Sequence, residues 1–247
     1  MPDFLGIIPS RYASSRFPGK PLAMIAGKPM IQWVYERASA HFDHLLVATD
    51  DRRIMEAVGH FGGRVLMTSL AHLSGTERCA EALRLYQERE KLTFSHVVNI
   101  QGDEPLIMKE QLQELTGCIN SPEAEIATLI RPLQEEDAAD PNTVKVVVDL
   151  QFRALYFSRS VIPFRRWESP SSGAVSQPYF GHVGIYAYRC DVLQKIAGLS
   201  PSPLEMMESL EQLRWLEHGI SIRTRITGYP SRGVDTPEDL EKIRKLF

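Results

Sequence analysis

The chain has 247 residues and a net charge of −3, with 43% hydrophobic and 24% charged residues. A chain of this length can bury about 70–75% of its unfolded surface, so its core needs no disulfide or metal. Its composition excludes collagen-like, low-complexity and largely disordered chains. A general nucleic-acid binder would be basic overall, and we therefore expect no nucleic-acid partner.

The cysteines and the apolar runs indicate the compartment. Cys79, Cys118 and Cys190 are far apart and form no CxxC pair, so the sequence predicts neither a disulfide framework nor a zinc site. No apolar run reaches the roughly 18 residues of a membrane span. The first residues lack the basic region and cleavage site of a signal peptide. We therefore expect a reducing, cytoplasmic location and no membrane contact.

The first half of the chain alternates between expected strands and helices. The strands are at residues 4–9, 44–49, 64–68 and 95–101, and the helices at 30–41, from Asp50 or Asp51 to about 61, 75–90 and 109–119. Residues 10–29 contain three prolines and two glycines and are expected to form a loop. The strands are apolar throughout, which is typical of a parallel sheet covered by helices on both faces.

After about residue 120 the pattern becomes that of a mixed sheet. Strands are expected at 125–131, 143–149, 153–157, 184–189 and, at an edge, 221–226, whereas 173–184 is uncertain. Helices are expected at 191–197, 204–217 and 237–246, the last capped by Thr236. No repeat or linker divides the chain. We predict one Rossmann-like α/β domain over residues 1–247, with a smaller subdomain in its second half.

The segment SRYASSRFPGK, residues 10–20, is the first candidate for chemistry. Residues 4–35 contain no Asp or Glu but carry Arg11, Arg16, Lys20 and Lys28. In an open parallel sheet, ligands bind beyond the carboxyl ends of the strands, where this loop lies. Arginine forks and a lysine point charge suit a polyphosphate. The loop is neither a Walker loop nor a G-x-G-x-x-G loop, and a solvated basic loop is the alternative.

This loop resembles the R-x-x-S-x-R-x-P-x-K signature of the sugar nucleotidyltransferase family, and most closely its branch of 3-deoxy-manno-octulosonate (Kdo) cytidylyltransferases. Further similar stretches follow in order: VATDD, HLSGTER, NIQGDEPLI, NTVKVV, ALYFSRSVIP, HVGIYAYR, SPLEMMESLEQLR and GVDTPEDLE. Together they span nearly the whole chain, which makes the resemblance specific.

The resemblance implies a Mg²⁺ site at Asp103 and Asp235. The QGDEP stretch follows the fourth expected strand, so its carboxylates lie on the same sheet edge as the basic loop. Mg²⁺ is usually held by one or two carboxylates together with phosphate oxygens. From the residues alone, Asp103 and Glu104 could simply form a turn before Pro105, and Asp235 could assist the cap of the last helix.

The resemblance also assigns the remaining site residues. The catalytic charges are Arg11, Arg16 and Lys20. Nucleotide binding is assigned to Ile8, Pro9, Ser74, Gly75, Thr76, Arg78 and Gln101. Binding of the acid sugar is assigned to Gln101, Arg159, His182, Tyr186, Glu211 and Gln212. Plain structural roles are the alternatives: capping for Ser74 or Thr76, packing for Tyr186 and His182, and a solvated helix face for Glu211.

The implied reaction is the transfer of CMP from CTP to the anomeric C2 hydroxyl of Kdo, with release of pyrophosphate and formation of CMP-Kdo for lipopolysaccharide synthesis. The resemblance also implies a homodimer, with a substrate and dimer-contact segment at about residues 150–190. The polar stretch 165–178 within it matches the family least well and is expected to be either a mobile loop or a dimer-contact region. Two alternatives stay open. One is a cytidylyltransferase for a related acid sugar, such as 8-amino-Kdo or a sialic acid, and the other is a non-catalytic nucleotide-binding protein of the same fold.

Overall fold

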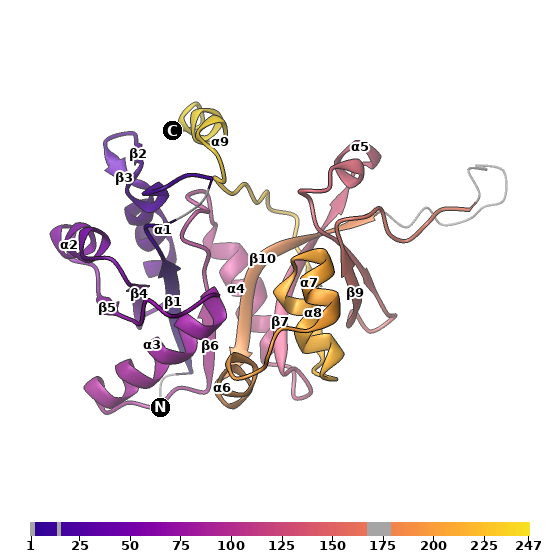
Figure 1. The fold of residues 1–247 in the computed structure, drawn as a ribbon, viewed down its shortest axis with the longest axis horizontal. Coiled ribbons are helices and arrows are strands. Elements are labelled where there is room, and N and C mark those ends of the chain that lie inside the picture. Colours follow the sequence, from indigo (N-terminus) through magenta and orange to yellow (C-terminus); the bar gives the residue numbers. More distant parts are fainter. Residues whose placement is uncertain (1–2, 14–15, 167–178) are drawn as a thin grey trace.

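The computed structural model describes residues 3–13, 16–166 and 179–247. A single sheet of nine strands runs through these residues, in the order β5-β4-β1-β6-β10-β7-β11, and β8 and β9 extend it from β10 (Figure 1). The strands are β1 (Phe4–Ser10), β4 (Leu45–Thr49), β5 (Val65–Met67), β6 (His96–Asn99), β7 (Ile126–Leu133), β8 (Lys145–Val148), β9 (Ala154–Ser158), β10 (Tyr179–Arg189) and β11 (Ile222–Ile226).

The first half is the predicted parallel sheet with helices on both faces. Strands β5, β4, β1 and β6 pair in parallel. Adjacent residues of β1 point to opposite faces: Ile7 packs with α3 (Gly75–Glu90), and Ile8 packs with α1 (Met30–Ser39), α2 (Arg52–His60) and α4 (Lys109–Ile119). Because both faces are buried, the strands need no polar alternation. The carboxyl ends of β1 and β6 therefore open at one edge of the sheet.

The second half is mixed, as the sequence predicts. Strand β10 runs antiparallel to both β6 and β7, and β11 pairs in parallel with β7 at the end of the sheet. Helices α6 (Cys190–Ala197), α7 (Pro203–Glu208) and α8 (Glu211–Glu217) follow β10, and α5 (Glu135–Ala139) follows β7. The last helix, α9 (Pro237–Arg244), returns to the first half, where Leu240 and Ile243 pack against Ile25 and Met30 (Figure 1).

Several local predictions differ from the structure. The helix expected at 204–217 is wrong, because Ser209 adopts a left-handed φ of 53° and separates α7 from α8. The loop expected at 10–29 also contains the 3-10 helix η1 (Lys20–Leu22) and a hairpin of β2 (Met24–Ile25) and β3 (Lys28–Pro29). The uncertain region becomes part of β10 from residue 179 onward, and its residues 173–178 lie outside the described residues. Helix α5 has no counterpart among the predicted elements.

The predicted helix caps are correct. The side chains of Asp51, Ser74 and Thr236 each accept a hydrogen bond from a backbone N–H in the first turn of α2, α3 and α9. Such caps satisfy backbone donors that have no partner within the helix. None of the described helices combines the length and the apolar character needed to cross a membrane.

Candidate active site

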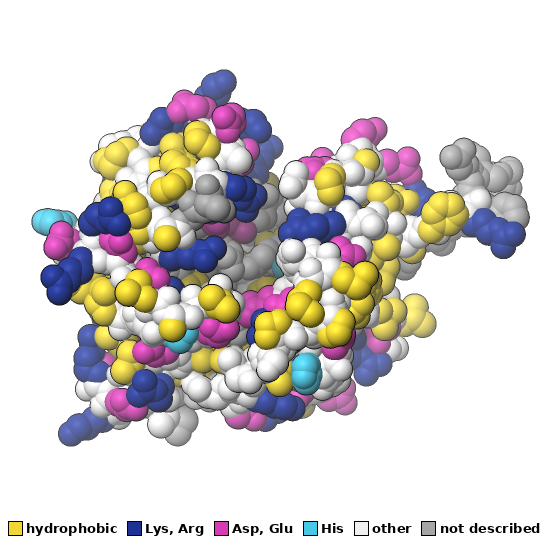
Figure 2. Space-filling model, viewed as in Figure 1, with side chains coloured by type: hydrophobic (Ala, Val, Ile, Leu, Met, Phe, Trp, Pro, Cys, Tyr) yellow, Lys and Arg dark blue, Asp and Glu magenta, His cyan; other side chains and the backbone are white. Residues whose placement is uncertain are grey.

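A cavity of about 290 Å³ opens at the carboxyl ends of β1 and β6. Figure 2 shows the molecule hollowed between its two halves, with basic and acidic side chains around the hollow. Ten of the predicted site residues line this cavity: Pro9, Arg11, Arg16, Lys20, Ser74, Gly75, Arg78, Gln101, Asp103 and Asp235. Residues from both ends of the sequence thus meet in one cleft.

Lys20 lies between the two predicted metal carboxylates. Its ammonium is 2.5 Å from Asp103 Oδ2 and 3.3 Å from Asp235 Oδ1, and Arg16 Nη2 lies 3.0 Å from the same Asp235 oxygen. The turn before η1 positions Lys20. Gly19 adopts a φ of 72° there, and a Cβ at Gly19 would come within 3.0 Å of the Tyr12 ring. Only glycine meets both demands without strain.

The two adjacent acids of the QGDEP stretch differ in their surroundings. The Asp103 side chain is 27% exposed and faces the cleft. Glu104 is only 7% exposed, and its Oε2 accepts a hydrogen bond from Ser231 Oγ at 2.8 Å. Burial raises the pKa of Glu104 to about 7. The carboxylate that faces the cleft at this edge is therefore that of Asp103 and not that of Glu104.

Asp235 reaches Asp103 through the tertiary structure alone. The preceding residue, Val234, is fully buried and donates its N–H to the Asp103 carbonyl at 2.9 Å. Thr236 then caps α9. The described residues include no group of three or more His, Cys, Asp and Glu side chains that could hold a metal. A pair of carboxylates that already attracts a lysine ammonium nevertheless suits Mg²⁺ when a triphosphate supplies further oxygens.

The start of α3 forms another side of the cavity. A Cβ on Gly75 would lie 3.4 Å from the Pro9 ring, so the helix start approaches β1 closely. The Ser74 hydroxyl accepts the N–H of Glu77, so Ser74 is an N-cap as well as a cavity residue. Arg78 lines the cavity, but its guanidinium donates to Asp50 Oδ2 at 2.6 Å, so its charge is already neutralised.

Five cavity residues are missed by the sequence analysis: Ser10, Pro21, His72, Leu73 and Gly102. His72 Nε2 donates to Glu81 Oε2 at 2.6 Å, which places the ring beside the start of α3. The HLSGTER stretch includes His72, so its position next to the predicted cap is a signal that could have identified it. Ser10 and Gly102 also lie in quoted stretches, SRYASSRFPGK and NIQGDEPLI, but their close approach to each other depends on the pairing of β1 and β6.

Seven predicted residues do not line this cavity: Ile8, Thr76, Arg159, His182, Tyr186, Glu211 and Gln212. Ile8 and Thr76 are buried in the core, and Thr76 Oγ1 donates to Glu211 Oε2 at 2.9 Å. This contact joins α3 to α8. The pKa of Glu211 is raised, because the effect of burial outweighs the hydrogen bonds from the Ser74 and Thr76 hydroxyls, which lower it.

Strand β10 carries His182 and Tyr186 on either side of a β-bulge. The pairing with β7 shifts register between Val183 and Tyr186, and bulges of this kind are frequent beside active sites. The two rings lie 5.2 Å apart, and Gln101 Nε2 donates to the Gly184 carbonyl within the bulge at 2.9 Å. This bond connects the predicted sugar-binding residues of β10 to the cavity. Burial lowers the pKa of His182 to about 3, so its imidazole is neutral at pH 7.

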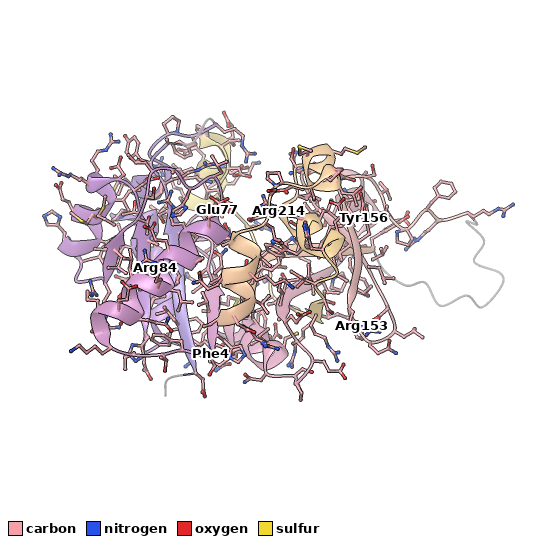
Figure 3. All side chains as sticks on the ribbon, turned by 60° about the horizontal axis from the view of Figure 1, so that its bottom comes forward. Phe4, Glu77, Arg84, Arg153, Tyr156 and Arg214 are labelled. Atoms are coloured by element: carbon pink, nitrogen blue, oxygen red, sulfur yellow. The ribbon has the colours of Figure 1, made fainter. Side chains whose placement is uncertain are left out.

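Arg159 makes hydrogen bonds away from this cavity, and Gln212 is buried. The Arg159 guanidinium donates to the carbonyls of Glu208 and Pro141, at 2.9 and 3.1 Å. Gln212 is 6% exposed. Figure 3 places Glu77 of α3 and Arg214 of α8 on facing sides of the junction between the two halves, where Arg214 forms a bidentate pair with Glu205.

The comparisons agree with this architecture. A family model described as Cytidylyltransferase matches residues 5–222. The 3-deoxy-manno-octulosonate cytidylyltransferase of Phocaeicola vulgatus is 50% identical, over 99% of this chain and 97% of that protein. The enzyme of the same name from Porphyromonas gingivalis is also 50% identical, over 97% of this chain and 94% of that protein.

Solved structures extend the likeness to the fold. The structure of a CMP:2-keto-3-deoxy-manno-octonic acid synthetase complexed with CTP has a TM-score of 0.88 and 46% identity, and covers 99% of this chain and 98% of that one. The 4-diphosphocytidyl-2C-methyl-D-erythritol synthase of Anaerococcus prevotii has a TM-score of 0.59 at 11% identity, over 99% of this chain and 98% of that one, and so shares the fold. The chain belongs to the cytidylyltransferase family, in its branch of 3-deoxy-manno-octulosonate cytidylyltransferases.

Proposed function

We propose that this protein transfers CMP from CTP to the anomeric C2 hydroxyl of Kdo, releasing pyrophosphate and giving CMP-Kdo for lipopolysaccharide synthesis. One observation carries the proposal. Arg16, Lys20, Asp103 and Asp235 converge at the carboxyl ends of parallel strands, in a chain about 50% identical to enzymes named for this activity. A cleft that joins basic side chains to a pair of carboxylates suits a triphosphate with its metal ion.

The residues of the cleft act mainly by positioning and charge neutralisation. The C2 hydroxyl oxygen of Kdo forms a bond to the α-phosphorus and loses its proton to the solvent, and the bond from that phosphorus to the pyrophosphate oxygen breaks. Arg16 and Lys20 neutralise the charge that develops on the leaving pyrophosphate, and Arg11 lies nearby in the same cavity. Asp103 and Asp235 would hold Mg²⁺, which when bound neutralises charge at the α-phosphate.

Substrate binding changes the partners of Lys20. Lys20 forms ion pairs with Asp103 and Asp235. A bound triphosphate offers Lys20 new anionic partners, which frees both carboxylates for the metal ion. The same lysine can therefore exchange its carboxylate partners for phosphate oxygens when the substrate binds.

The remaining assignments divide between nucleotide and sugar. Pro9, Ser74 and Gly75 line the cavity and bind the nucleotide. Ile8 and Thr76 lie behind the cavity lining and contribute to nucleotide binding from there, Ile8 through its backbone. Arg78 is held in place by its ion pair with Asp50. Gln101, His182, Tyr186 and Glu211 bind the sugar, His182 as a neutral hydrogen-bonding ring. Arg159 and Gln212 belong to the same sugar-binding set.

We further propose a homodimer and a cytoplasmic location. Leu155 on β9 and Met206 and Met207 on α7 are 60%, 65% and 81% exposed. Figure 2 shows hydrophobic side chains gathered over α7 and α8. Large exposed apolar patches mark interaction sites, and a second copy is the partner proposed here. A CTP substrate and the buried free thiols of Cys79 and Cys118 are in keeping with a reducing cytoplasm.

One assay tests the reaction. Pyrophosphate release is measured with each of four nucleoside triphosphates, with and without Kdo, and with Kdo replaced by 8-amino-Kdo or a sialic acid. We expect release that requires both CTP and Kdo. Release only with another acid sugar would reassign the acceptor. Absence of release under every condition, from folded protein that binds CTP, would identify a non-catalytic nucleotide-binding protein.

A further inference from the structure

The segment of residues 227–236 decides where Asp235 lies. It connects β11, at one end of the strand order, to α9, and Figure 1 shows the yellow chain that runs from α9 toward β10. At its start, Thr227 donates its N–H to the Ile130 carbonyl at 2.8 Å, and near its end Val234 donates to the Asp103 carbonyl at 2.9 Å. Between these two backbone anchors, Ser231 Oγ donates to Glu104 Oε2 at 2.8 Å.

Glu104 is an unusual partner for a solvent-facing segment. It directly follows Asp103, yet it is 7% exposed. Its other oxygen, Oε1, lies 4.0 Å from the position that a Cβ would occupy on Gly184, in the bulge of β10. Burying a carboxyl group is costly unless it is hydrogen bonded. The proposed reaction as described above gives Glu104 no role, so its burial calls for another explanation.

We infer that Glu104 and Ser231 form a positioning pair that holds residues 231–235 against residues 101–105 and so fixes the separation of Asp103 and Asp235. Each residue of the pair is close in sequence to one of the two carboxylates: Glu104 is the next residue after Asp103, and Ser231 precedes Asp235 by four residues. Loss of the bond leaves Val234 as the backbone contact between the two carboxylate-bearing loops. This inference rests on the proposed metal site and adds to it two residues that never touch the ion.

The effect of the pair is on metal affinity. Mg²⁺ demands near-ideal geometry at about 2.0–2.1 Å from its oxygens, so a small displacement of Asp235 weakens binding. Loss of a residue that orients metal ligands typically reduces metal affinity or activity by about 10–100-fold. A hydrogen bond that merely satisfied a buried acid would change stability and leave the metal affinity alone.

The experiment measures Mn²⁺ binding by electron paramagnetic resonance in the full chain, with and without CTP, and the Mg²⁺ concentration that gives half-maximal turnover. We expect Ser231→Ala to weaken Mn²⁺ binding about tenfold and to raise the half-maximal Mg²⁺ concentration similarly, with turnover largely restored at saturating Mg²⁺. Hydrogen exchange in residues 228–236 should become faster. Ser231→Thr keeps the hydroxyl and should restore both the wild-type metal affinity and the slower hydrogen exchange. Ser200→Ala, at an exposed serine, is the matched control.

A double variant separates positioning from stability. Ser231→Ala leaves Glu104 buried without its partner and can lower stability for that reason alone. Combining Ser231→Ala with Glu104→Met removes both polar groups, so we expect near wild-type unfolding and still about tenfold weaker Mn²⁺ binding. If Ser231→Ala keeps the Mn²⁺ affinity and the hydrogen-exchange rates of the wild type, the positioning pair is overturned and the proposed metal site is not. Wild-type protein that binds no Mn²⁺, with or without CTP, would overturn the proposed metal site and this inference with it.

Discussion

His182 links the pH dependence of stability to the candidate sugar site. The ring lies on β10 between Phe157 and Tyr186, with ring centroids 5.2 Å from each, and its Nε2 hydrogen bonds with Thr128 Oγ1 at 3.0 Å. Burial lowers the pKa of His182 to about 3. An unfolded histidine titrates near pH 6.5, so the folded and unfolded chains differ by about one proton between roughly pH 3 and 6.5.

The direction in which stability changes with pH depends on which state of the chain, folded or unfolded, binds the proton. Below about pH 6.5 the unfolded chain takes up a proton that native His182 does not, so acidification favours unfolding. The stability is fully present above the unfolded pKa and falls as the pH drops toward the folded pKa. At pH 5 the loss from this one residue is about 2 kcal/mol relative to pH 7. His41 and His96 also have pKa values lowered by burial and add to the wild-type slope.

The assay is denaturant unfolding of wild-type protein and of His182→Gln at several pH values between 5 and 7. We expect the free energy of unfolding of the variant to depend less steeply on pH, by about 2 kcal/mol over this range. His60→Gln, at the exposed end of α2, is the matched control for loss of a histidine. Equal slopes in wild type and His182→Gln would refute the conclusion that native His182 stays neutral.

Three further predictions concern residues that line the cleft. Lys20→Ala should reduce kcat by about 100-fold or more, because Lys20 neutralises charge on the leaving pyrophosphate, and should change the thermal midpoint little, because Lys20 lines the cleft and is not part of the core. Near-normal turnover would exclude its role in charge neutralisation. Asp103→Asn should abolish Mg²⁺-dependent turnover, and an unchanged Mg²⁺ titration would remove Asp103 from the metal site. Arg78→Met leaves the partly buried Asp50 carboxylate without its partner and should cost about 3 kcal/mol of stability in urea unfolding, whereas a loss below about 1 kcal/mol would show that the pair is not structural.

Local sequence patterns determined most of the elements of the first half. The helix expected at 75–90 matches α3, and Asp51 and Ser74 form the caps that short polar side chains form before a helix. The acid-free stretch at residues 4–35 also pointed to an anion site, and Arg11, Arg16 and Lys20 do line the cavity. These features depend on neighbours a few residues away, which is why the sequence alone could indicate them.

Tertiary packing decided the rest. Sequence spacing could not predict the meeting of Asp103 and Asp235, because they are brought together by the crossing of the sheet, the burial of Val234 and the anchoring of α9. It also could not tell Asp103 from Glu104, since their different burial comes from a hydrogen bond to a residue 127 positions away. Backbone hydrogen bonding and periodicity are local, whereas the distance between two carboxylates is set by contacts across the whole fold.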